Sequence, residues 1–250
     1  MSDFVLGVLE VGRPSPKLAA KHGSYPDLFR ALLSPHASDM NICCYAVLDG
    51  VFPQSVNHCD AWLVTGSPTS VLDDDPWIEP LRAFLAQAHS QQIPIVGICF
   101  GHQILAEALG GRVEVSGKGW GAGVHRYDVY KQASWMDPKP REHRDSAEFA
   151  IQALHQDQVV ELPEDAEVLA GSDFCPYGVL SYGDTAISFQ GHPEINAVLA
   201  RDIINLRRGD QIPQSRADHA LDTVDDAEDA NTVARWIVRF LRQAPKDNDP

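Results

Sequence analysis

Cys99 stands in the stretch GICFG (residues 97–101), where a short apolar run ends and a helical pattern begins. The form glycine–x–nucleophile–x–glycine is typical of a tight strand-to-helix turn that pushes its central side chain out at the carboxyl edge of a sheet. The N-terminus of the following helix would favour thiolate over thiol, and the backbone N–H of Phe100 would suit an oxyanion hole. We therefore predict that Cys99 is a nucleophile. The alternative is a buried structural cysteine at a glycine-bounded turn.

A base for such a thiol is offered by the stretch FQGHPE (residues 189–194). His192 follows an apolar, strand-like run, and Glu194 stands two residues later. The carboxylate could accept the imidazole N–H and fix its tautomer, which is the arrangement of a cysteine–histidine–acid triad. His-Pro-Glu alone would indicate a surface loop. Combined with the cysteine turn, it predicts His192 as the base and Glu194 as its orienting partner.

The elements that must position these groups alternate along the N-terminal half. Strand-like runs occur at residues 4–11, 42–48, 61–65 and 93–98, and residues 79–92 have helical spacing. This order predicts a flavodoxin-like or Rossmann-like, doubly wound α/β fold with a mostly parallel sheet. From residue 112 to about 190 the strand-like pieces are shorter, which indicates a small antiparallel edge or satellite sheet.

The C-terminal part has a different composition. Residues 209–231 are polar and acidic, which predicts a loop or a weakly ordered connector, and residues 232–242 form an amphipathic helical pattern. We expect residues 1–206 to form the main domain. Residues 207–250 would add an acidic connector and a C-terminal helix packed on that same domain.

Bulk composition disfavours several classes of function. The chain has 250 residues, a formal net charge of −15 and a pI of about 4.9, so it should repel nucleic acids and anionic membrane surfaces. It lacks a basic leader and any apolar stretch long enough to span a bilayer, so we expect a cytoplasmic protein. Its five cysteines contain no C-x-x-C pair. We therefore predict neither a disulfide framework nor a metal site, and the chemistry above needs no cofactor.

Taken together, GICFGHQ and FQGHPE resemble the class I glutamine amidotransferase domain. This is the triad-type glutaminase found in GMP synthetase, anthranilate synthase and carbamoyl phosphate synthetase. The resemblance extends from the first strand to about residue 206 and implies the fold of that family. It implies Cys99 as nucleophile, His192 as general base and acid, and Glu194 as orienting carboxylate. It also implies that Gln103 contacts the bound substrate.

Two further stretches carry the same resemblance. VTGSPTSV (residues 64–71) is similar to the family loop that gives the second oxyanion-hole N–H, here from Ser67 or Gly66. The family usually has glycine before this proline, and the side chain of Ser67 restricts a backbone flip there. LHQDQVVELP (residues 154–163) is similar to the family segment that holds the amino-acid head group of the substrate, which implies that His155 and Asp157 bind substrate.

The resemblance leaves three functions open. The first is a GMP synthetase-like standalone glutaminase that releases ammonia from glutamine to a separate synthase, because only about 45 residues follow residue 206 and a synthetase domain needs roughly 100 or more. The second is a γ-glutamyl peptidase or hydrolase acting on γ-glutamyl peptides or conjugates. The third is a non-catalytic regulatory or binding relative, which the intact Cys99, His192 and Glu194 argue against.

Overall fold

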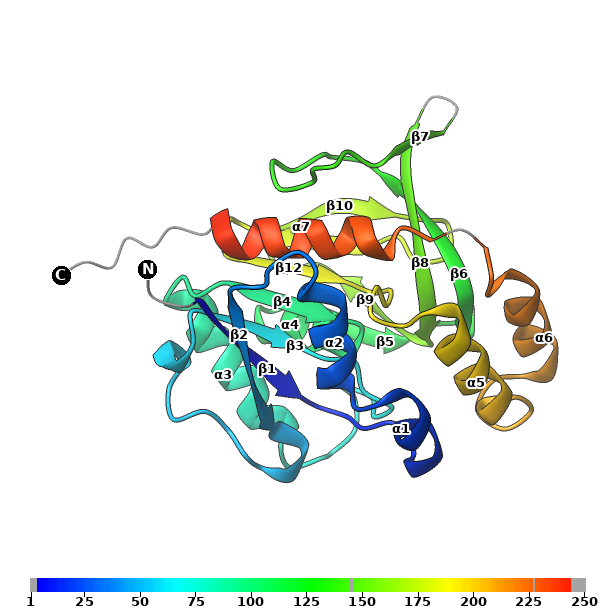
Figure 1. Cartoon of the computed structure of the whole chain (residues 1–250), viewed down its shortest axis with the longest axis horizontal. Coiled ribbons are helices and arrows are strands. Elements are labelled where there is room, and N and C mark those ends of the chain that lie inside the picture. The colour runs from blue at the N-terminus through cyan, green and yellow to red at the C-terminus, as the bar shows by residue number, and fades with distance from the viewer. Residues whose placement is uncertain (1–3, 144–145, 227, 244–250) are drawn as a thin grey trace.

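The structure is a computed structural model that describes residues 4–143, 146–226 and 228–243. A ten-stranded sheet runs through the molecule in the order β2-β1-β3-β4-β12-β11-β10-β6-β8-β7 (Figure 1). Its parallel half consists of β1 (Phe4–Glu10), β2 (Met40–Ala46), β3 (Ala61–Val64), β4 (Ile95–Ile98) and β12 (Ala186–Phe189). This half confirms the predicted doubly wound, mostly parallel arrangement.

The antiparallel strands extend the same sheet on one side. They are β11 (Val179–Tyr182), β10 (Ala166–Gly171), β6 (Gly121–Val129), β8 (Ser146–His155) and β7 (Arg141–His143). A separate two-stranded sheet pairs β5 (Arg112–Val115) with β9 (Asp157–Glu161). The strand-like piece at residues 186–190 differs from expectation, because it forms β12 and runs parallel to β4. Both faces of β12 are buried, as in the other central strands.

Helices cover both faces of the sheet. Helices α2 (Tyr25–Leu33) and α7 (Ala230–Gln243) pack on one face, and α3 (Ile78–Ser90) and α4 (Phe100–Ala108) pack on the other (Figure 1). Alternate residues of β3 belong to different cores: Leu63 packs with α2 and α7, whereas Trp62 and Val64 pack with α3 and α4. This alternation follows from the two-residue repeat of a strand and fixes the register of the sheet.

A third group of helices lies beyond the end of the long β6–β8 pair. It consists of α1 (Pro16–His22), α5 (Ala197–Arg207) and α6 (Gln214–Thr223) (Figure 1). Helix α5 confirms the helical spacing after residue 196, although Val198 and Leu206 are exposed and do not belong to its buried face.

Helix α6 corrects the prediction of a loop or weakly ordered connector at residues 209–231. Ala217 and Ala220 are completely buried, and a Cβ at Gly123 of β6 would meet the carbonyl oxygen of Ala220 at 2.8 Å. The acidic side chains point outward while small apolar residues pack directly on the strand, so overall polarity concealed an amphipathic helix. Residue 227 of this segment and residues 244–250 lie outside the described residues.

In the part of the chain that the structure describes, no helix is both long and apolar enough to cross a membrane.

Candidate active site

The turn at Cys99 has a strained backbone. Cys99 joins β4 to α4 with φ 53° and ψ −100°, a conformation that side chains rarely adopt. A Cβ at Gly97 would lie 2.4 Å from the carbonyl oxygen of Gly101, and a Cβ at Gly101 would lie 2.5 Å from that of Val64. Only glycine fits at both flanking positions. The sequence prediction of a crowded strand-to-helix turn is confirmed.

Strand pairing brings His192 to the same edge of the sheet as Cys99. Strands β4 and β12 are parallel neighbours with Ile98 opposite Phe189, and the Cys99 N–H donates a hydrogen bond to the Phe189 carbonyl at 2.8 Å. His192 follows three residues later, where its backbone N–H donates to the Gln152 carbonyl at 2.7 Å. Carboxyl ends of parallel strands are where open α/β sheets bind ligands. Two residues 93 positions apart in the sequence are therefore neighbours.

His192 and Glu194 form a buried pair behind the thiol. The Nδ1 of His192 lies 2.7 Å from Glu194 Oε1, and both side chains are shielded from solvent. Burial lowers the pKa of His192, but the charges of Cys99 and Glu194 and hydrogen bonds to both outweigh it and raise this pKa to about 10. Because Glu194 occupies Nδ1, the other ring nitrogen, Nε2, is left to face Cys99. The arrangement favours an imidazolium beside a thiolate.

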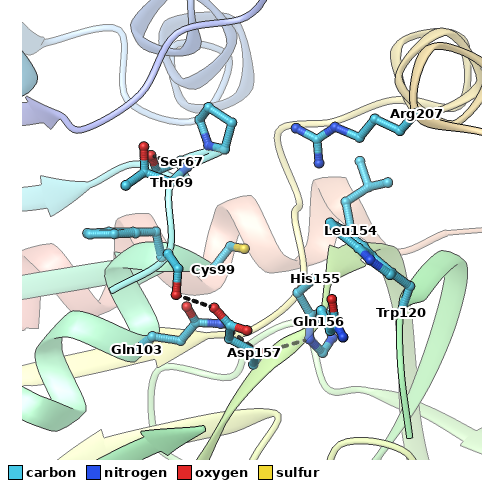
Figure 2. A pocket seen from close by; sticks show the side chains of 13 residues that line it. Ser67, Thr69, Cys99, Gln103, Trp120, Leu154, His155, Gln156, Asp157 and Arg207 are labelled. Carbon is cyan, nitrogen blue, oxygen red and sulfur yellow. Dashed lines mark hydrogen bonds between the residues drawn. The ribbon is translucent and has the colours of Figure 1, made fainter. Parts of the chain in front are cut away.

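A cavity of about 150 Å³ opens beside Cys99 (Figure 2). This volume has room for on the order of ten water molecules. It lies where loops from both halves of the sheet meet. Its lining consists of Ser67, Pro68, Thr69, Ser70, Cys99, Phe100, Gln103, Trp120, Leu154, His155, Gln156, Asp157 and Arg207. A smaller adjoining cavity is lined by Tyr25, Gly66, Ser67, Leu154, His192, Glu194, Ile195, Ile203 and Arg207.

Gln103 and Asp157 lie together on one side of the cavity. The Gln103 side-chain amide donates to the Asp157 carbonyl at 2.8 Å, and the Ser70 hydroxyl donates to the Asp157 carboxylate at 2.5 Å. His155 completes this group, with Nδ1 at 3.2 Å from the same Asp157 carbonyl. The structure thus brings together the three residues for which the sequence implied substrate contact. Whether they bind substrate stays a prediction.

His155 is a neutral polar group in this wall. Burial, followed by the charge of His125, lowers the pKa of His155 to about 3. Its Nε2 has no hydrogen-bond partner among the described residues. A neutral imidazole with Nδ1–H donated to the Asp157 carbonyl would leave Nε2 as a free acceptor at the cavity.

The loop after β3 approaches the catalytic pair closely. A Cβ at Gly66 would lie 2.9 Å from Cε1 of His192, so a side chain does not fit there. The Ser67 hydroxyl donates to the Val11 carbonyl at 2.8 Å and accepts from the Thr69 N–H at 3.1 Å, which ties the loop in place. Ser67 and Phe100 both line the main cavity. The oxyanion-hole roles of Gly66, Ser67 and Phe100 stay predictions.

Comparison with known proteins identifies the family. The family model described as glutamine amidotransferase class-I matches residues 47–202, more than half of the chain. The chain belongs to the class I glutamine amidotransferase family. The crystal structure of a glutamine amidotransferase from Thermotoga maritima superposes with a TM-score of 0.71 and covers 97% of both chains at 16% identity. This likeness confirms the fold.

Relatives in the class I amidotransferase family carry two kinds of name. Gamma-glutamyl peptidase 4 of Arabidopsis thaliana is 30% identical over 95% of this chain and 96% of that protein. A glutamine-hydrolysing component of the GMP synthase of Halobacterium salinarum is 32% identical over 70% of this chain and 85% of that protein. Family membership therefore places the chain among proteins of amide hydrolysis and amide transfer.

Sequence reasoning missed two lining residues that stand out in this member of the class I family. Trp120 and Arg207 lie on the cavity wall, and the Arg207 guanidinium lies 5.8 Å from the centre of the Trp120 ring. Trp120 could have been found as a lone aromatic residue in the glycine-rich stretch GKGWGAG. Arg207 gave no signal, because a basic residue in the last turn of a helix has an ordinary structural explanation.

His102, the histidine nearest to Cys99 in the sequence, plays a structural part. It is completely buried, its Nδ1 lies 2.8 Å from the Ser188 hydroxyl, and burial lowers its pKa to about 3. Such a ring cannot take part in proton transfer at the cavity. Within the described ranges, no group of three or more histidine, cysteine, aspartate or glutamate side chains could hold a metal ion.

Proposed function

We propose that this chain is a cysteine-dependent hydrolase of γ-glutamyl amides, with Cys99 as nucleophile, His192 as general base and acid, and Glu194 as orienting carboxylate. The observation that supports it most strongly is the buried Glu194–His192 pair beside a thiol held at φ 53°. A strained, glycine-flanked cysteine costs stability, which a purely binding protein of this family has no reason to retain. Catalysis explains that cost.

In the first half of the reaction, the Cys99 sulfur attacks the γ-carbonyl carbon of the substrate amide. The carbonyl oxygen becomes an oxyanion, for which the backbone N–H groups of Phe100 and of Ser67 or Gly66 are the proposed donors. His192 gives its Nε2 proton to the amide nitrogen, and the C–N bond breaks. Ammonia or an amine departs, and a γ-glutamyl thioester remains on Cys99.

In the second half, neutral His192 takes a proton from water while the oxygen of that water attacks the thioester carbon. The same N–H groups hold the second oxyanion. The C–S bond then breaks, glutamate or its derivative leaves, and the thiolate–imidazolium pair is restored. Glu194 touches no substrate in this scheme and acts by holding the imidazole.

The two substrate classes differ in the group that leaves. Glutamine releases ammonia, which could be passed to a separate synthase, as the relative named as a GMP synthase component suggests. A γ-glutamyl peptide releases an amine. We place γ-glutamyl peptides first, because the relative named gamma-glutamyl peptidase 4 matches almost the whole of this chain, whereas the GMP synthase component matches less of it. The glutaminase that supplies a synthase is the second candidate.

The test is turnover by the purified chain of glutamine and of a γ-glutamyl dipeptide, each assayed with Cys99→Ala. We expect dipeptide hydrolysis to exceed glutaminase activity, and Cys99→Ala to lose at least about 10³-fold in kcat/KM. Cys44→Ala is the matched control, because Cys44 is exposed and lies on β2. Equal activity in Cys99→Ala and the wild type would contradict the proposal. Glutamine turnover well above dipeptide turnover would favour the second candidate.

A further inference from the structure

Arg207 is a half-buried cation at the cavity that lacks a paired anion. It is the last residue of α5 and lines both cavities. Its guanidinium lies over the Trp120 ring at 5.8 Å, and among the described residues it makes no hydrogen bond or ion pair. Its neighbour Arg208, by contrast, pairs with Asp218. Partial burial without an anionic partner costs free energy that a bound carboxylate would recover.

The elements around Arg207 and Trp120 are packed firmly enough to present a site. Helix α5 is anchored by Leu199, Ala200, Ile203 and Ile204, all buried in the third core. The turn before Trp120 is tied to α6, because the Arg216 guanidinium donates to the Lys118 carbonyl at 2.9 Å. Stacking on an indole ring also restricts a guanidinium to fewer orientations.

Arg207 lies on the opposite side of the nucleophile from the residues expected to hold the glutamyl group. In Figure 2 the Cys99 sulfur lies between Arg207 and the pair Gln103 and Asp157. An acyl group seated at Gln103 and Asp157 with its γ-carbon at the sulfur would therefore direct its leaving amine toward Arg207. This step rests on the proposed function.

We propose that Arg207, stacked on Trp120, binds the α-carboxylate of the amino acid that leaves from a γ-glutamyl peptide. That carboxylate is attached two bonds from the scissile nitrogen, on the side of the cavity where the guanidinium lies. Planar Arg–carboxylate pairing is directional and adds affinity as well as orientation. Ammonia has no carboxylate, so the site distinguishes γ-glutamyl peptides with a free carboxylate from glutamine and from neutral γ-glutamyl amides.

The overall charge of the molecule strengthens this inference. The chain carries a formal net charge of −15, so an anionic leaving group meets a repulsive field at long range. A local cation at the cavity is the means by which such a molecule could bind one. The Leu154 side chain beside Arg207 excludes water and strengthens the pair.

The experiment compares γ-glutamyl-alanine with γ-glutamyl-alaninamide, which differ only in the leaving-group carboxylate, and adds glutamine as a third substrate. For Arg207→Gln we expect kcat/KM on γ-glutamyl-alanine to fall roughly 10- to 100-fold, mainly through KM. Activity on the alaninamide and on glutamine should stay within about twofold of the wild type, because neither presents a carboxylate to Arg207. Arg208→Gln, one residue along, is the matched control and should leave all three substrates unaffected.

Two outcomes would overturn the inference. An equal loss on all three substrates would mean that Arg207 holds the glutamyl group or the fold, and no loss on γ-glutamyl-alanine would mean that it binds nothing there. Arg207→Lys keeps the charge and should recover part of the activity if the folded site is intact. Binding of the same two ligands to Cys99→Ala, measured by calorimetry, tests the carboxylate preference without turnover. A chain that prefers γ-glutamyl-alanine in binding yet fails to hydrolyse it would refute the proposed function and leave this inference standing.

Discussion

The three groups at the scale of single residues differ in what they must do. Cys99 forms and breaks a bond, and His192 moves protons. Glu194 lies 2.7 Å from His192 and acts only through that ring. Its negative charge raises the pKa of His192 against the opposing effect of burial. Losing Glu194 should therefore change the protonation of His192 as well as the rate.

For Glu194→Gln we predict that kcat falls by about 10²- to 10⁴-fold, because the imidazole loses its orienting anion. The pKa of His192 should fall from its raised value, since one of the charges that raises it is gone. On the alkaline side, deprotonation of His192 removes the partner of the thiolate. The pH above which Cys99 is no longer alkylated rapidly should thus move down in the variant.

The measurement for that variant is the rate of Cys99 alkylation as a function of pH, followed by peptide mapping. Glu79→Gln, on the exposed side of α3, serves as the control and should keep the wild-type profile. An alkaline limb at the same pH in Glu194→Gln and the wild type would mean that Glu194 does not tune His192.

At the scale of elements, the cysteine turn depends on a close approach between β4 and the first turn of α4. A methyl group at Gly97 would meet the backbone oxygen of Gly101 at 2.4 Å, and backbone atoms cannot rotate away as a side chain could. For Gly97→Ala we predict a free energy of unfolding lower by about 1–3 kcal/mol, together with loss of activity. Urea unfolding measures the first effect.

Gly117→Ala is the matched control for that change. A Cβ at Gly117 meets nothing within 4 Å and its φ is not in the left-handed region, so stability should stay within about 0.5 kcal/mol of the wild type. If Gly97→Ala proved as stable and as active as Gly117→Ala, the turn would be looser than the structure implies.

The elements nearest to the nucleophile could be predicted from the sequence because their signals are local. The glycines two residues on either side of Cys99 report a steric conflict within one turn, and the apolar run before them reports a fully buried strand. Helix α6 could not be predicted in this way. Its buried face consists of small residues such as Ala217 and Ala220, which give little hydrophobic contrast, and it is stabilised by packing against β6.

At the scale of the whole molecule, the sheet order explains both the success and the limit of sequence reasoning about the site. The carboxyl ends of β3, β4 and β12 meet at one edge, so loops after strands that are distant in sequence become neighbours. That rule is general and made the pairing of Cys99 with His192 predictable. The position of Arg207 depends on how α5 packs beyond β8, which no short pattern in the sequence encodes. The division of the chain at residue 206 stays a prediction.

The central claim, that Cys99 carries a γ-glutamyl group during turnover, is tested most directly by quenching the wild-type chain with acid while it hydrolyses a γ-glutamyl dipeptide. Mass spectrometry of the intact protein and of its peptides then locates any acyl group. Cys43, Cys44, Cys59 and Cys175 are internal controls, since all are free thiols. We predict one γ-glutamyl group, carried by the peptide that contains Cys99 and absent from Cys99→Ala. Steady hydrolysis with no acyl group on Cys99, and with undiminished rate in Cys99→Ala, would contradict the account.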